Sequence, residues 1–375
     1  MKKNNLIQTS KRIIIKIGSA LLIDKEKGTL RKKWLETLAL DIFNLIKLKK
    51  EVVVVSSGSI ALGKKQLNLR NNLTLDEKQA AAATGQISLA HAWKEVMLEH
   101  GLNVAQILLA PDDTETRRKH LNARATLIKL LELGVIPVIN ENDTVSTEEI
   151  KFGDNDRLAA RVAQMCSADL LILLSDIIGL YSSDPNKNKN ATLIEEVTEI
   201  STEIETMAGP ANSKISSGGM VTKIEAAKIS MNAGCHMIIC DGRLDNPLLK
   251  LEENEKTFSW FKAKDHPLNL RKQWISGALD AKGKIIIDNG ATQAVKKGFS
   301  ILPAGILKTE GNYEKGDLIK IIDQNETFIG TGLTHFNNLE VELIKGSKSE
   351  KIENILGYRG KDEVVHRDDL VLEKK

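Results

Sequence analysis

Residues 12–19 read RIIIKIGS, a nearly continuous apolar run that ends in a lysine, a glycine and a serine. Strands that are buried on both faces of a parallel sheet read as continuous apolar runs, whereas half-exposed strands alternate. Five further runs have the same character, at residues 51–55 (EVVVV), 104–109, 135–139 (VIPVI), 169–174 (DLLILL) and 236–240 (HMIIC). The runs therefore predict a buried, mainly parallel sheet.

Helix-like stretches separate these apolar runs. Parallel neighbouring strands need a long crossover connection, which is usually an α-helix. The alternation predicts an α/β fold, a three-layer sandwich with a mainly parallel central sheet. Polar stretches at residues 142–152 and 181–191 predict a small hairpin and a surface loop. The expected helices cover residues 32–48, 76–100, 121–133, 155–166 and 220–233.

The pattern changes after about Trp260. Helical periodicity stops there, and short strand-like segments separated by glycines take over, at residues 284–287, 318–322 and 327–329. We expect a boundary near residues 262–276. The expected parts are a catalytic domain (1–262), a linker (263–277) and a small β-rich domain with a C-terminal extension (278–375).

The composition is that of an ordinary globular protein, with 42% hydrophobic residues and a formal net charge of +3. So small a charge does not favour a dominant nucleic-acid surface. The three cysteines form no C-x-x-C pair, which predicts buried thiols rather than disulfides or a zinc site. No signal-peptide pattern or long apolar run occurs, which predicts a cytoplasmic protein without membrane contact.

Two lysines stand out by their settings. Lys16 lies at the carboxyl end of the first expected strand, where ligands bind in open α/β sheets. Lys223 closes the segment SGGMVTK (217–223), in which two glycines open a helix. Free amides and the dipole at a helix N-terminus attract phosphate oxygens. Taken singly, a structural cation and a solvated surface lysine remain alternatives.

A second glycine segment, GSIALGKK (58–65), is one residue short of a P-loop. Lys65 stands where a serine or threonine must ligate magnesium, so the P-loop interpretation is disfavoured. The preceding residues 56–58 (SSG) better suit a turn that binds a substrate carboxylate.

Polar segments follow two other expected strands and precede one expected helix. Residues 140–143 (NEND) and 153–157 (GDNDR) combine amides with acids, which suits the ammonium and carboxylate groups of an amino acid. Residues 174–176 (LSD) with 179–185 (GLYSSDP) form a further strand-end turn that suits a nucleoside. Ordinary turns and helix caps have similar compositions, so these segments do not decide the function singly.

Taken together and in order, six of these segments resemble the amino acid kinase superfamily over about 260 residues: KIGS, SSGSIALG, INEND, GDND, LLSDIIGLYSSDP and GGMVTKIEAA. Within that superfamily, KQAAAATGQ (78–86), LNARATL (121–127) and VIPVINENDTVSTEEIKFGDND resemble the glutamate 5-kinase family. Residues 283–305 and 311–317 resemble a PUA domain, a small β-barrel better known from RNA-modifying enzymes.

The resemblance implies ATP-dependent phosphorylation of the side-chain carboxylate of L-glutamate, the first step of proline biosynthesis. It implies that Lys16 and Lys223 neutralise charge on the phosphoryl group and that Asp156 holds both lysines. It also implies Mg²⁺ bridging the phosphates of ATP, with no metal site built from protein residues. The implied glutamate-binding residues are Ser57, Asp143 and Asn155, and the implied ATP-binding residues are Lys16, Ser175, Asp176, Ser217, Gly218, Gly219, Met220, Val221, Thr222 and Lys223.

The resemblance also implies proline as a feedback inhibitor, a homo-oligomer and a possible partnership with glutamyl 5-phosphate reductase. RNA binding by the PUA domain stays open. The chain departs from the family pattern at Ser216-Ser217, where Gly-Thr is expected, and this puts ATP affinity in question. Alternatives are a kinase for another acid such as aspartate or N-acetylglutamate, for a nucleotide or for carbamate, an RNA-binding PUA protein, and an amino-acid sensor.

Overall fold

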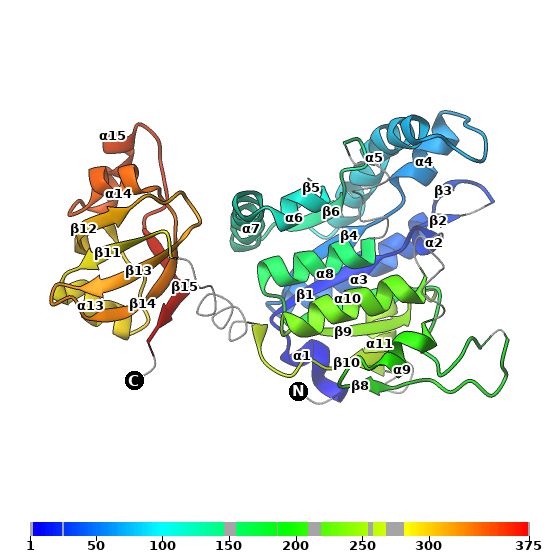
Figure 1. Ribbon diagram of the computed structural model, residues 1–375. Helices are drawn as coiled ribbons and strands as arrows, with labels where there is room; N and C mark the ends of the chain where they lie inside the picture. The colour runs from blue at the N-terminus through cyan, green and yellow to red at the C-terminus, as the bar shows by residue number, and fades with distance from the viewer. Residues whose placement is uncertain are drawn as a thin grey trace. The chain divides into compact units, whose positions relative to one another are not determined.

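The structure is a computed structural model that describes residues 3–24, 26–145, 155–185, 187–208, 219–253, 258–267 and 281–373. The chain divides into two compact units, Met1–Pro267 and Leu268–Lys375. Figure 1 colours the first unit from blue to yellow-green and the second from yellow to red. Residues 268–277 of the expected linker lie outside the described ranges, as does most of the expected hairpin at 142–152.

An eight-stranded sheet forms the centre of the first unit, in the order β5-β6-β4-β1-β7-β9-β10-β8. Every neighbouring pair is parallel except β9 and β10, which run antiparallel. The expected mainly parallel sheet is confirmed, but β8 and β10 were not expected. The bounds are β1 (Arg12–Ile17), β4 (Glu51–Ser56), β5 (Val104–Leu109), β6 (Ile136–Glu141), β7 (Leu170–Ser175), β8 (Glu196–Val197), β9 (His236–Asp241) and β10 (Phe258–Phe261).

Helices connect these strands. The five expected helices are present, and the largest shift of a boundary is at α7, which begins four residues earlier than expected. They are α3 (Lys32–Lys47), α5 (Leu75–Leu98), α7 (Arg117–Glu132), α8 (Asn155–Cys166) and α10 (Met220–Asn232). Shorter helices that were not expected are α1 (Leu6–Thr9), α2 (Ser19–Leu22), α4 (Ser59–Gln66), α6 (Pro111–Glu115), α9 (Thr202–Met207) and α11 (Pro247–Glu253). The small hairpin β2 (Ile23–Asp24) and β3 (Thr29–Leu30) follows α2.

The two faces of the sheet pack against different helices. Successive residues of a strand point to opposite faces. Ile13 and Ile15 of β1 therefore join the core that includes Leu38 of α3, whereas Ile14 joins the core under α8 and α10. Lys16 lies two residues after Ile14 in the strand, so its side chain points to the same face of the sheet, the face that α8 and α10 cover. In Figure 1 these two helices cross the front of the sheet beside β1.

Helices α4 and α5 cross in unusually close contact through two glycines. A Cβ atom on Gly85 would lie 1.9 Å from the carbonyl oxygen of Ser59, and one on Gly63 would lie 1.8 Å from the carbonyl oxygen of Ala81. Both obstacles are backbone atoms, which cannot rotate away. The crossing brings the start of α4 and the middle of α5 together at the carboxyl edge of the sheet.

We predict that Gly85→Ala separates α4 from α5, because the added methyl group overlaps the backbone of α4. Overpacking of this kind costs about 1–3 kcal/mol of unfolding free energy, measured by urea titration. Thr84→Ala, a change of similar size on the same helix, is the control and is expected to change stability by less than about 1 kcal/mol. Equal stability of the two variants would contradict the prediction.

The second unit is a five-stranded sheet in the order β12-β11-β13-β14-β15, with only the β11–β13 pair parallel. The expected small β-rich domain is confirmed, and among its described residues three short helices that the sequence pattern did not indicate pack against the sheet. They are too short for a clear periodicity, although Asp288 and Asn337 cap two of them. The elements are β11 (Gly283–Ile287), α13 (Asn289–Lys296), β12 (Ile306–Gly311), β13 (Leu318–Asp323), β14 (Phe328–Thr334), α14 (Asn338–Ile344), α15 (Ile352–Leu356) and β15 (Val365–Leu372).

The three cysteines, Cys166, Cys235 and Cys240, are buried and free, as expected. Burial raises the pKa of the Cys166 thiol to about 11, so it stays protonated and serves as a small apolar side chain. In the part of the chain that the structure describes, none of the helices has the length and apolar character needed to cross a membrane.

Candidate active site

Two buried lysines share one buried carboxylate at the carboxyl edge of the central sheet. The Nζ atom of Lys16 lies 2.5 Å from Oδ1 of Asp156, and the Nζ atom of Lys223 lies 2.8 Å from Oδ2. Their side chains are 8%, 1% and 6% exposed for Lys16, Asp156 and Lys223. Lys16 comes from β1, and Asp156 and Lys223 come from α8 and α10, the helices that pack on the face of the sheet to which Lys16 points.

The electrostatics of this triad favour an added anion. Burial alone raises the pKa of the Asp156 carboxyl, but the ammonium groups of Lys16 and Lys223 outweigh burial and lower it below the ordinary value. The ionised carboxylate holds two buried ammonium groups close together. Ammonium groups donate charge-assisted hydrogen bonds to phosphate and carboxylate oxygens, so the triad suits a negatively charged group.

Helix α10 adds a second source of positive potential. It begins at Met220, with Gly219 as its N-cap, and Lys223 lies one turn inside. The first N–H groups of a helix have no partner within the helix and bind anions. Thr222 donates through Oγ1 to the carbonyl of Gly219 at 2.7 Å, which ties this first turn together. Ser217 and Gly218, both expected to contact ATP, and the departure at 216–217 lie outside the described residues.

The expected glutamate-binding residues are joined by a network of side-chain hydrogen bonds. Asn155 donates through Nδ2 to Oγ of Ser57 at 2.8 Å and to Oδ1 of Asn140 at 2.8 Å. Asn140 donates in turn to Oγ of Ser59 at 3.1 Å, and Ser59 donates to Oδ2 of Asp143 at 3.5 Å. The structure therefore brings together Ser57, Asp143 and Asn155, which were expected to bind substrate.

Three members of this network, Ser59, Gln86 and Asn140, were not among the implied substrate-binding residues, although Asn140 belongs to the segment 140–143 that suited an amino acid. Asn140 stands in the quoted segment INEND, and its place at the end of a buried strand was an available signal. Gln86 ends the quoted segment KQAAAATGQ, but nothing in the sequence shows that α5 crosses α4 closely enough to bring it to the site.

Ser175 and Asp176 lie on the other side of β1. Ser175 ends β7 and is paired in register with Asp241, the last residue of the neighbouring strand β9. It donates through Oγ to Oδ1 of Asp176 at 3.3 Å. In the sheet, β1 stands between β4 and β7. Lys16 on β1 therefore lies between the Asn155 network, on the side of β4, and Ser175 and Asp176, on the side of β7.

The P-loop alternative for residues 58–65 does not match the backbone. Gly58 has a left-handed φ of 117° and forms the turn after β4, and α4 begins at Ser59. Lys64 and Lys65 lie in the last turn of that helix, whereas the lysine of a P-loop follows a phosphate-binding loop. The turn at residues 56–58 leads into the hydrogen-bond network described above.

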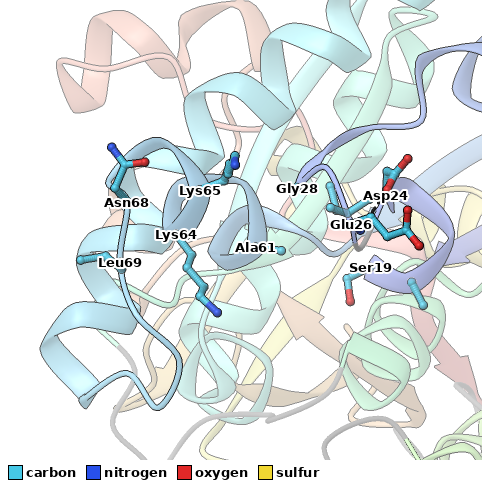
Figure 2. A pocket seen from close by; sticks show the side chains of 11 residues that line it. Ser19, Asp24, Glu26, Gly28, Ala61, Lys64, Lys65, Asn68 and Leu69 are labelled. Atoms are coloured by element: carbon cyan, nitrogen blue, oxygen red, sulfur yellow. Dashed lines mark hydrogen bonds between the residues drawn. The ribbon is translucent and has the colours of Figure 1, made fainter.

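Two cavities lie near these residues. Cavity A, of about 510 Å³, is lined by residues of α2, α4 and the β2–β3 hairpin, with Ser19, Asp24, Glu26, Lys64 and Lys65 among them. Figure 2 shows Lys64 and Lys65 on α4 across from Asp24 and Glu26. None of the expected site residues lines cavity A.

Cavity B, of about 280 Å³, adjoins the hydrogen-bond network. Its lining includes Ser59, Gln86 and Asp143, with Ala82 and Ala83 of α5 forming an apolar part of the wall. Cavity B is therefore lined both by Asp143, the one carboxylate that was expected to bind substrate, and by residues that the sequence did not single out.

No cluster of three or more His, Cys, Asp or Glu side chains suited to a metal ion occurs among the described residues. The donor set at the triad is one carboxylate already paired with two lysines, which does not fit a metal ion bound by the protein itself.

Comparison with known proteins places the two units in two families. The model of the amino acid kinase family matches residues 11–241, and the model of the PUA domain matches residues 283–356. The chain is 52% identical over 367 residues to the glutamate 5-kinase of Paramagnetospirillum magneticum, covering 98% of this chain and 99% of that protein. It is 52% identical over 363 residues to that of Bradyrhizobium diazoefficiens, covering 96% and 97%. Among solved structures, the carbamate kinase from Giardia lamblia bound to AMP-PNP is 19% identical with a TM-score of 0.49, covering 68% and 99%.

Proposed function

The chain belongs to the amino acid kinase family and, within it, to the glutamate 5-kinases, and we propose that Lys16, Lys223 and Asp156 carry its phosphoryl transfer from ATP to the side-chain carboxylate of L-glutamate. The observation that carries this assignment is the pair of buried ammonium groups on one carboxylate. Phosphoryl transfer depends mainly on positioning and on stabilisation of charge, and the triad offers both.

The reaction needs no nucleophile from the protein. The γ-carboxylate of glutamate is ionised at neutral pH, and one of its oxygens forms a bond to the γ-phosphorus of ATP as the bond to the bridging oxygen of ADP breaks. The product is an acyl phosphate, and no proton has to move. Lys16 and Lys223 stabilise the negative charge on the transferred group, while Asp156 keeps both ammonium groups aimed at one point.

The two substrates approach from opposite sides of β1 in this proposal. Ser57, Asp143 and Asn155 hold glutamate beyond β4, and their shared hydrogen-bond network supports this assignment. Ser175 and Asp176 beyond β7 meet the nucleotide. The residues that contact the phosphates are Lys16, Ser217, Gly218, Gly219, Met220, Val221, Thr222 and Lys223.

Magnesium enters with ATP as part of the substrate, bound by phosphate oxygens. Magnesium is commonly held through phosphates with few protein ligands.

Regulation and partners are proposed on the same family membership. Proline is a feedback inhibitor that competes for the glutamate site, the active protein is a homo-oligomer, and the labile acyl phosphate passes to glutamyl 5-phosphate reductase. The small net charge of the chain does not favour RNA as a ligand of the PUA domain.

We predict ATP-dependent acyl-phosphate formation with L-glutamate, measured by trapping the product with hydroxylamine. Aspartate, N-acetylglutamate and uridylate are expected to give less than about a hundredth of that rate, because a site built to hydrogen-bond one substrate rejects analogues that leave its polar groups unpaired. Proline should lower the rate with glutamate. Turnover of another acid in preference to glutamate would overturn the proposal.

A further inference from the structure

We propose that Gln86 is a specificity-determining residue that donates a hydrogen bond to the α-carboxylate of the amino-acid substrate. The inference rests on the proposed function and extends it to the far end of the substrate. Gln86 stands on α5, one residue after the glycine at which α5 crosses α4. It lines cavity B and is half-buried.

Three amide side chains form a relay that ends at Gln86. Asn155 donates through Nδ2 to Oδ1 of Asn140 at 2.8 Å, and Asn140 donates through Nδ2 to Oε1 of Gln86 at 2.8 Å. Asn140 and Asn155 are only 3% and 8% exposed. Burial holds these two amides in one arrangement, because a buried amide without partners is costly.

The direction of the relay is set by a backbone group. An amide side chain offers donors at its nitrogen and acceptors at its oxygen, and reversing all three amides would preserve the bonds between them. The Nδ2 atom of Asn155, however, also lies 3.3 Å from the carbonyl oxygen of Ser56, in addition to the two acceptors at 2.8 Å that its two hydrogens serve. Turned the other way, the amide would place its own oxygen against that carbonyl oxygen and the two would repel, so Asn155 presents its nitrogen there, and the other two amides follow.

This direction decides what Gln86 offers a ligand. Its Oε1 is occupied by Asn140, so its Nε2 group, with two N–H donors, is the end of the amide available to cavity B. Asp143 and Glu141 line the same cavity, and each supplies a carboxylate. A donor beside a carboxylate matches the carboxylate and ammonium groups of an α-amino acid.

Glutamate carries a carboxylate at each end. The γ-carboxylate has to meet the phosphoryl group at Lys16 and Lys223, so the α-carboxylate must be bound farther along the acceptor side. Asn155 adjoins Asp156 in the chain, and the relay from Asn155 through Asn140 to Gln86 leads away from the lysines into cavity B.

The test is Gln86→Glu in the full-length protein, with steady-state kinetics. A glutamate side chain still accepts from Asn140 but presents a carboxylate oxygen, in place of the N–H donors, to the substrate carboxylate. We expect KM for L-glutamate to rise about 100-fold with kcat within about threefold, because a charged hydrogen bond is replaced by repulsion between like charges. L-Glutamate α-amide, which lacks that charge, should lose less than about fivefold in kcat/KM.

Two further variants complete the test. Gln86→Met removes the donor without adding charge, and KM should rise about 10-fold. Gln66→Glu makes the same charge change on α4, where Gln66 is exposed and bonded to Ser88, and its KM should stay within twofold.

The outcomes separate the two proposals. A KM within threefold of the unaltered protein in Gln86→Glu would mean that Gln86 only anchors Asn140, and would overturn the inference while the proposed function stands. An unaltered protein that fails to phosphorylate glutamate would overturn the proposed function and this inference together.

Discussion

Lys223→Ala is expected to lower kcat about 100- to 1,000-fold, because one of the two ammonium groups that stabilise charge on the transferred phosphoryl group is lost. The effect should appear in kcat rather than in KM for glutamate, since Lys223 acts on the group in transfer. Acyl-phosphate formation trapped with hydroxylamine, together with circular dichroism to confirm folding, measures it.

The fold should tolerate this change. Asp156 keeps its contact with Lys16, 2.5 Å from its carboxylate, so the buried negative charge stays paired. The matched control is Lys228→Ala on the same helix, where the lysine is 43% exposed and pairs with Glu205. Exposed ion pairs contribute little, so the control should keep its activity within twofold. Near-normal turnover in Lys223→Ala would show that Lys223 does not take part in the reaction.

Asp156→Asn is expected to lower the free energy of unfolding by about 3–5 kcal/mol at pH 7, measured by urea titration. The change leaves two buried ammonium groups facing each other without their shared counter-charge. Activity should fall as well, since nothing then aims both lysines at one point. The exposed Asp112→Asn, which loses a surface pair with Lys119, is the control and should leave the midpoint of the urea titration essentially unchanged.

The pH dependence gives an independent check on Asp156. Its folded-state pKa lies below the ordinary value of 3.8, so the carboxylate contributes its full stabilisation above about pH 4 and loses it as the pH falls through the folded-state pKa. The difference in stability between the unaltered protein and Asp156→Asn should be constant from about pH 5 to 7 and shrink below about pH 4. A difference that grows towards acid would refute the assigned charge state.

Several elements were predictable because local sequence carries their signal. Continuous apolar runs identified β1, β4, β5, β6, β7 and β9, and the helices between them followed from the need for crossovers. The strand β10 was missed because four residues, three of them aromatic, form too short a pattern, and because it pairs antiparallel with β9. Helix α4 was missed because Gly63 is unfavourable in a helix on propensity alone.

The close crossing of α4 and α5 explains why position 63 is a glycine. Gly63 and Gly85 stand where α4 and α5 approach too closely for any side chain, a requirement that arises only between two helices and not within either one. The same crossing carries Gln86 to the substrate side of the site. Helix propensity disfavours a glycine at position 63 of α4, whereas the close packing of α4 against α5 requires one.

The sequence by itself determined six strands of the central sheet, the five long helices between them, and the placement of Lys16 at a strand end and of Lys223 behind two glycines. That Asp156 holds both lysines was implied by the family resemblance alone. The contact itself depends on which face of β1 Lys16 points to and on α8 and α10 packing over that face, which only the tertiary structure decides. Tertiary structure alone also decided the direction of the amide relay. One backbone carbonyl, that of Ser56, fixes it, and hydrogen-bond direction is a property of contacts that residue types do not reveal.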